Sequence, residues 1–171
     1  MEISEGNLSF TFNGALSGYK FDEQDQTSTH YHGLSHCMKG VDLVIEQEDV
    51  WLFIEVKDPS HPDSTPEQIA AFAKKVRSTE LVSDLVHKYR DTFLYHWAEQ
   101  KVEKPIHYLC LITLESALVL QLMNQLKRQL PEGRANNQRW QRAIADRCIV
   151  ANLETWNSSF PHIPVQRVRG E

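Results

Sequence analysis

The sequence predicts an α/β fold, a central mixed β-sheet flanked by helices on both faces, built as a single domain over residues 1–171. Runs rich in β-branched residues occupy 41–46, 50–57 and 106–114, and helical patterns lie between and after them. Both alternating faces of these runs are largely apolar, as expected of strands that are covered on two sides. With 41% hydrophobic and 24% charged residues, the composition is typical of globular proteins.

The first forty residues predict a hairpin followed by a loop. Two short β-type runs in 8–21 surround Asn13-Gly14, a dipeptide that favours a two-residue hairpin turn. Residues 22–40 are polar and aperiodic, which indicates a loop.

The remaining elements follow from capping signals and apolar periodicity. Thr65 and Gln68 form a capping box around Pro66, and they predict the start of a helix. Further expected elements are helices at 83–100, 116–130 and 136–148, a strand at 149–153, and an irregular tail from Trp156 with an edge strand at 165–168.

Charged residues lie inside the runs 41–46 and 50–57, where an unpaired charge is costly. With a turn centred on residues 48–49, paired residue numbers sum to 97, and Asp42 lies across from Glu55. Lys57 shares the face of Glu55 because side chains alternate along a strand. A register slip of one residue would turn Asp42 to the opposite face.

Two carboxylates at this separation repel each other unless a cation lies between them. Oxygen ligands of this kind suit Mg²⁺, and a neighbouring lysine can orient a water molecule or stabilise charge on a phosphate oxygen. A structural ion cluster at a strand end is the alternative reading of Asp42, Glu55 and Lys57.

Asp42, followed by Glu55-Val56-Lys57 at the end of the next strand, resembles the active-site hairpin of the PD-(D/E)XK nuclease superfamily. The resemblance covers about the first two-thirds of the chain and implies a restriction-endonuclease-like fold. It implies that Asp42, Glu55 and the Val56 carbonyl bind Mg²⁺ or Mn²⁺, and that Lys57 assists the attacking water. Val41 stands where many members have proline before the aspartate.

Two further positions follow from the same resemblance. Many members carry a metal-binding acid on an early helix, and Glu23 is its best counterpart here. Many also place a basic residue on the helix after the hairpin, which indicates Lys88 as a catalytic residue. A solvated helix face with paired charges is the alternative for Lys88, Arg90 and Asp91.

The resemblance implies a metal-dependent nuclease that hydrolyses phosphodiester bonds, in DNA first of all, in defence or repair. The alternatives are a non-cleaving protein of the same fold that binds nucleic acid or a partner protein, and an unrelated α/β protein. Whether the chain forms a homodimer stays open.

The segment HYHGLSHC contains His30, His32, His36 and Cys37. Its spacing matches no recognised zinc site, so a polar loop over the mouth of the active site is preferred to a zinc site.

Charge is distributed unevenly along the chain. Residues 1–100 contain 8 basic and 17 acidic residues, whereas residues 101–171 contain 10 basic and 6 acidic residues. The basic half is expected either to follow a nucleic-acid backbone or to be simply solvated. Its candidates are Lys127, Arg128, Arg134, Arg139, Arg142 and Arg147.

A cytoplasmic protein is expected. The three cysteines are widely spaced and do not indicate a disulfide framework. The N-terminal stretch lacks the pattern of a signal peptide. The longest apolar run is interrupted by Glu115 and is too short to span a bilayer, so no membrane partner is expected.

Overall fold

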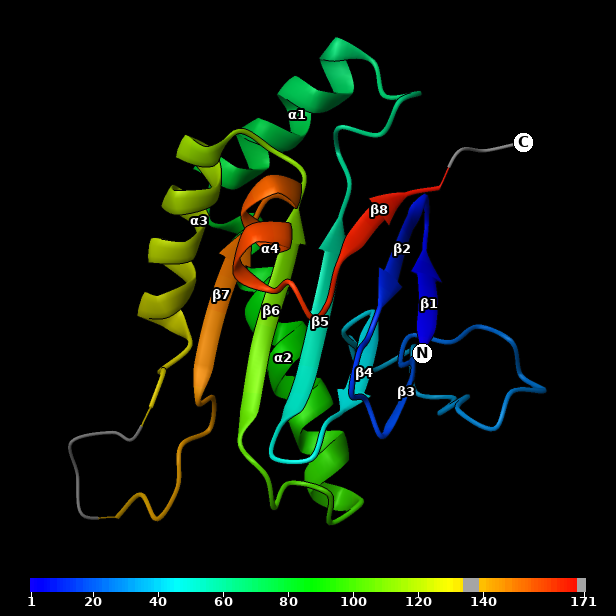
Figure 1. Cartoon of the computed structure of the whole chain (residues 1–171). Helices are drawn as coiled ribbons and strands as arrows, with labels where there is room; N and C mark the ends of the chain where they lie inside the picture. Colours follow the sequence, from blue (N-terminus) through cyan, green and yellow to red (C-terminus); the bar gives the residue numbers. More distant parts are fainter. Residues whose placement is uncertain (134–138, 169–171) are drawn as a thin grey trace.

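The computed structural model describes residues 1–133 and 139–168, which form two β-sheets and four helices (Figure 1). The strands are β1 (Glu2–Glu5), β2 (Leu8–Thr11), β3 (Ser17–Lys20), β4 (Leu43–Glu46), β5 (Trp51–Lys57), β6 (Ile106–Ile112), β7 (Arg147–Ala151) and β8 (Val165–Arg167). The helices are α1 (Pro66–Arg77), α2 (Glu80–Ala98), α3 (Ser116–Gln129) and α4 (Leu153–Ser159).

The larger sheet has the strand order β3-β4-β5-β6-β7 and is mixed. Strands β3, β4 and β5 pair antiparallel, whereas β5, β6 and β7 pair parallel. This arrangement confirms the predicted α/β class with a central mixed sheet. The smaller sheet has the order β1-β2-β8 and is antiparallel.

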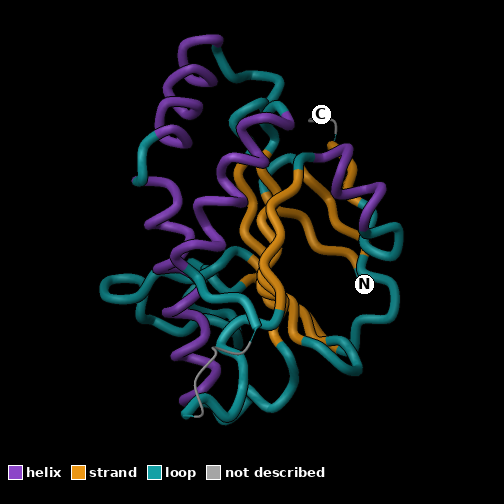
Figure 2. The backbone as a smooth tube through the Cα atoms, turned by 90° about the vertical axis from the view of Figure 1, so that its left-hand side faces the viewer, coloured by secondary structure: helices purple, strands orange, loops and turns teal. Residues whose placement is uncertain are grey.

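The two faces of the larger sheet are covered differently. Helices α1, α2 and α3 pack on one face, in an apolar cluster that includes Val76, Leu85 and Leu122. The opposite face packs against the smaller sheet and α4, in a cluster that includes Phe10 and Trp156. Figure 2 shows helices on one side of the central strands, and the smaller sheet with a short helix on the other. Helices thus lie on both faces, as expected, but the smaller sheet, which the sequence did not predict, covers the second face together with the short helix α4.

The predicted hairpin at Asn13-Gly14 is wrong. The turn lies earlier, where Glu5 pairs with Leu8 across Gly6 (φ +55°). The residues around Gly14 instead carry the chain from the smaller sheet to the larger one, because β2 pairs with β1 and β8 while β3 pairs with β4. A turn dipeptide marks a change of direction, and tertiary burial decides which strands then pair.

The predicted helix at 136–148 is also wrong over its described part. Residues 139–146 form turns and bends, residues 134–138 lie outside the described range, and β7 begins at Arg147. Asp146 accepts a hydrogen bond from the Ile106 N–H and donates its own N–H to the Ile106 carbonyl. These bonds tie the segment to the start of β6 and take the place of helical hydrogen bonds.

The starts of the other helices can be compared with the capping signals in the sequence. Thr65 and Gln68 form the predicted capping box at the start of α1. The helix that was expected from residue 83 begins at Glu80. The tail contains an unpredicted helix, α4, whose N-terminus is capped by Asn152. Within the described ranges, none of the helices combines the length and apolar character needed to cross a bilayer.

Candidate active site

The β4–β5 hairpin has the predicted register. Leu43 pairs with Ile54, so paired residue numbers sum to 97, and the alternative register slip is excluded. Asp42 lies directly before β4 and turns its carboxylate toward the end of β5. There its Oδ2 accepts a 2.7 Å hydrogen bond from the backbone N–H of Val56.

The backbone hydrogen bonds between β4 and β5 stop at the pair Leu43–Ile54, because the N–H groups of the next residues donate to side chains instead. The Val41 N–H donates to Thr92 Oγ1 at 3.0 Å, and the Val56 N–H donates to Asp42. The N–H and C=O of one strand residue point to the same side. The Val56 carbonyl therefore faces the same strand edge as the Asp42 carboxylate.

Glu55 is completely buried in β5 (0% exposed). Its Oε1 lies 2.5 Å from Lys57 Nζ and 2.9 Å from Lys88 Nζ. Neither contact has the angles of a hydrogen bond, and Oε2 has no hydrogen-bond partner among the described residues. Burial, and then the charge of Asp42, raise the pKa of Glu55 to about 7 against the opposing effect of the two lysines. The structure thus buries an incompletely satisfied carboxyl group.

Lys88 reaches this pair of acids from α2. Its Nζ lies 3.3 Å from Asp42 Oδ1 and 2.9 Å from Glu55 Oε1, and its side chain is 16% exposed. Burial disfavours the charged amine, but the attraction of Glu55 and Asp42 outweighs that effect, so the pKa of Lys88 is raised. The Lys88 ammonium therefore binds both carboxylates.

Glu55, Lys57 and Lys88 line a cleft of about 450 Å³. The segment 22–40 forms its other side. Lys39 fastens this segment to α2, because its Nζ lies 2.7 Å from Asp84 Oδ1 and its backbone N–H donates to Asp91. The sequence predicted a loop over the site, and the structure places part of that loop there.

All of the predicted site residues except Glu23 lie close together in the structure. Asp42, Glu55, Val56, Lys57 and Lys88 converge, whereas Glu23 uses its Oε1 to accept the N–H of Asp25 in its own loop.

Among the described residues no three His, Cys, Asp or Glu side chains lie close enough together to hold a metal ion, so Glu23 does not complete the carboxylate pair. Its neighbours Asp22 and Gln24 line the cleft instead. The sequence of this loop has no helical periodicity, so it could not indicate which loop residue faces the cleft.

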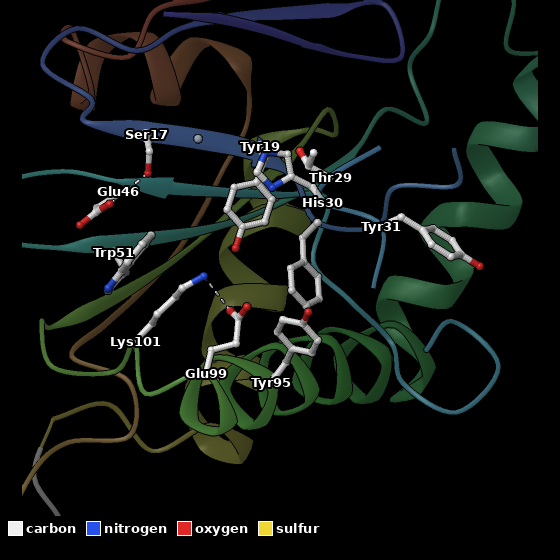
Figure 3. Close-up of a pocket in the computed structure, with 12 residues that line it drawn as sticks. Ser17, Tyr19, Thr29, His30, Tyr31, Glu46, Trp51, Tyr95, Glu99 and Lys101 are labelled. Atoms are coloured by element: carbon white, nitrogen blue, oxygen red, sulfur yellow. Dashed lines mark hydrogen bonds and ion pairs between the residues drawn. The ribbon is translucent and has the colours of Figure 1, made fainter. Parts of the chain in front are cut away.

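Within the described ranges, the histidine-rich segment contributes to no group of three His, Cys, Asp or Glu side chains that could hold a metal ion. His30 stacks on Tyr19, with ring centroids 4.3 Å apart, and His32 stacks on Phe21 at 5.0 Å. The histidines thus hold the loop against β3 and the residue that follows it. A second hollow, lined by aromatic rings, lies beside this segment (Figure 3).

Among the described basic candidates of the second half, Lys127 and Arg142 are bound within the fold. Lys127 pairs with Glu132 at 2.9 Å, and Arg142 donates to the carbonyls of Val102 and Lys104. Arg128 and Arg147 are exposed, on α3 and β7. Arg134 lies outside the described residues.

Sequence reasoning missed a network directly after β5. Arg167 of β8 donates two hydrogen bonds, of 2.6 and 2.7 Å, to the Asp58 carboxylate. Thr113 Oγ1 donates to Asp58 at 2.5 Å and accepts from the N–H of Ser60. The network holds the strand end that carries Lys57. Its members are distant in sequence, and no local pattern connects them.

Comparisons of the chain with protein-family models, with curated proteins and with solved structures find no match.

Proposed function

We propose that the protein is a metal-dependent nuclease of the PD-(D/E)XK type that hydrolyses phosphodiester bonds, with DNA as its first expected substrate. The observation that supports this proposal is the convergence of two acids and two amines. Glu55, Lys57 and Lys88 line one cleft, and Asp42 joins them through its ion pair with Lys88. Two acids provide ligands, and two amines provide positive charge where a phosphate would bind.

The donor set fits Mg²⁺ or Mn²⁺. Asp42 and Glu55 offer carboxylate oxygens, and the Val56 carbonyl faces the same strand edge as Asp42. Mg²⁺ is commonly bound through one or two carboxylates and keeps several waters, so a third acid is not required. The buried Glu55 Oε2 without a hydrogen bond is the atom that gains most from a cation. A bound metal ion would polarise the phosphate and make a water molecule more acidic.

The lysines have separate roles in this proposal. Lys57 is 32% exposed and lies at the cleft end of β5, where its amine can stabilise charge on a phosphate oxygen or orient the attacking water. Lys88 occupies the space between the two carboxylates. It must withdraw from them when a divalent cation binds, and its charge is then available to the substrate phosphate.

A second candidate is a protein of the same type that binds nucleic acid or a partner protein without cleaving it. The position of Lys88 favours this candidate, because an internal ammonium already neutralises the two acids. In this case Asp42, Glu55, Lys57 and Lys88 form a balanced ion cluster. The two candidates differ in whether a divalent cation can displace Lys88.

The test is a cleavage assay with single-stranded, duplex, nicked and branched DNA and with RNA, in Mg²⁺, Mn²⁺ or EDTA. Lys57→Ala should reduce turnover about 100-fold or more and affect binding less, since its amine acts during the reaction. Asp49→Asn, at an exposed position of the same hairpin, is the matched control and should retain parental activity. Salt-sensitive binding without cleavage of any substrate would favour the second candidate.

A further inference from the structure

The sheet face that carries the candidate active site also carries a second hollow, of about 410 Å³ (Figure 3). We call it the aromatic pocket. The rings that line it are Tyr19, Phe21, His30, Tyr31, Trp51 and Tyr95. Ligand pockets in proteins commonly have this size, with apolar walls and a few polar groups that fix orientation.

The rings of the aromatic pocket are held in place by contacts with one another and with the buried His96. Tyr19 stacks on His30 with an angle of 7° between the ring planes, and its hydroxyl lies 3.1 Å from His96 Nε2. Phe21 meets Tyr95 edge to face at 5.1 Å. A planar ligand would therefore meet preformed ring surfaces, which lowers the entropic cost of binding.

The charged groups around the aromatic pocket are already paired. Glu46 accepts hydrogen bonds from Ser17 at 3.0 Å and from Lys104 at 2.7 Å. Glu99 forms an ion pair with Lys101 at 3.1 Å. Neither a permanent cation nor an anion finds an unpaired charge in these walls. A neutral planar group with hydrogen-bonding edges suits them best, and a nucleobase has this chemistry.

The aromatic pocket lies a short distance from the candidate active site. Trp51 and Glu55 share one face of β5 four residues apart, which is about 13 Å along a strand. Lys88 and Tyr95 are seven residues apart on α2, about 10 Å along the helix. Because nucleotides of a stacked strand are about 3.4 Å apart and those of an unstacked strand are farther apart, these spans cover at most about three or four nucleotides.

We propose that the aromatic pocket binds an unstacked base of a nucleic-acid strand whose backbone crosses the candidate active site. The proposal rests on the proposed function and adds to it a preference for single-stranded or locally melted substrates, since a base inside a duplex cannot reach the rings. Stacking on such rings binds every base type, so the expected preference is for strand state and not for sequence.

The test measures binding of a fluorescently labelled single-stranded DNA 15-mer by anisotropy in EDTA, so that cleavage does not affect the result. Tyr95→Leu removes one ring, and Thr29→Trp fills the cavity without removing any ring. Each should weaken binding about tenfold or more. Trp97→Leu is the matched control on the same helix, because Trp97 is 61% exposed and lies outside the aromatic pocket.

A second series contains one abasic nucleotide at each position of the 15-mer. One or two neighbouring abasic positions should weaken binding to the parent protein, and no position should stand out for Thr29→Trp. The proposal is overturned if the parent does not bind the strand, if both pocket variants bind it as the parent does, or if Trp97→Leu causes the same loss.

Failure of the pocket and failure of the proposed hydrolysis give different results. If the parent does not cleave any substrate but shows pocket-dependent binding, hydrolysis is refuted and the base-binding pocket stands. If the parent cleaves and both pocket variants bind and cleave as it does, the pocket is refuted and hydrolysis stands.

Discussion

Lys88 places its ammonium group within 3.3 Å of both Asp42 and Glu55, which is the position that a divalent cation between two acids would take. The amine and the metal ion therefore compete for the same oxygens. Their competition distinguishes a working nuclease site from a balanced ion cluster, and it can be measured without any substrate.

Lys88→Met should strengthen Mn²⁺ binding by about tenfold or more, because it removes the competing charge and leaves two repelling carboxylates. Without metal the variant should unfold at a lower temperature than the parent, since it leaves largely buried acids without one of their cations. Thermal unfolding across a Mn²⁺ titration gives both results. Lys75→Met, at an exposed position of α1, is the control. An equal Mn²⁺ response in the parent and in Lys88→Met would contradict the proposed competition.

Asp42→Asn should abolish the thermal stabilisation that Mn²⁺ gives while preserving the fold. The amide retains an oxygen that can accept the Val56 N–H but loses the charge that binds a cation. Asp49→Asn, which makes the same chemical change in the exposed turn, should retain the full Mn²⁺ response. If Asp42→Asn responds to Mn²⁺ as the parent does, the carboxylate pair is not the metal site.

At the scale of the element, Thr92 holds the chain just before β4 begins. Its hydroxyl accepts the N–H of Val41 and donates to the carbonyl of Lys88, one turn earlier in α2. One buried side chain thus joins the start of the hairpin to the helix that carries Lys88. The spacing between the acids and the lysine depends on this joint.

Thr92→Val should destabilise the protein by about 1–3 kcal/mol, because it leaves the buried Val41 N–H without an acceptor in a side chain of nearly the same shape. It should also weaken the Mn²⁺ response by displacing Asp42. Chemical denaturation measures the first effect. Thr79→Val is the control, since Thr79 is exposed and its side chain makes no capping hydrogen bond. A change below 0.5 kcal/mol would show that Thr92 does not support the joint.

The hairpin of the candidate site could be predicted from sequence because its information is local. Alternation indicated which residues share a face, and a turn centred on residues 48–49 gave the register that pairs Leu43 with Ile54. The capping box at Thr65 was predictable for the same reason. Asp42, Glu55 and Lys57 follow from these local rules, whereas the contact of Lys88 with both acids depends on how α2 crosses the sheet.

Other features depend on contacts between distant residues. The segment at 139–146 is irregular because Asp146 and Arg142 bond to the region before and at the start of β6. The choice between Glu23 and Asp22 as the residue at the cleft depends on the path of an aperiodic loop. The small sheet could not be predicted either, because β8 joins it from the far end of the chain.

At the scale of the whole molecule, the smaller sheet supports the end of β5. Among the described strands, none of the smaller sheet pairs with one of the larger sheet. The two sheets are joined by apolar packing and by the bonds that Arg167 of β8 makes to Asp58 and to the carbonyl of Ser60. Since Asp58 directly follows Lys57, this junction fixes the position from which Lys57 reaches the cleft.

Because of this junction, the free energy of unfolding should fall when the pH is lowered into the acid range. Burial alone would raise the pKa of Asp58, but the hydrogen bonds from Arg167 and Thr113 outweigh it and hold the pKa below the usual value. A depressed folded-state pKa contributes stability that is complete above the unfolded-state value of about 3.9 and is lost as pH falls through the folded-state value.

Asp58→Asn should therefore cost about 1–2 kcal/mol at pH 7, a range discounted for partial exposure of the pair. The difference from the parent should shrink below about pH 4 as Asp58 of the parent takes up its proton. Urea unfolding of both proteins between pH 3 and pH 7 measures it. Asp63→Asn, on an exposed carboxylate of the same connection, is the control. A difference that stays constant over the whole range would mean that Asp58 stabilises the junction by packing and not by its charge. The smaller sheet would then support Lys57 equally well in acid.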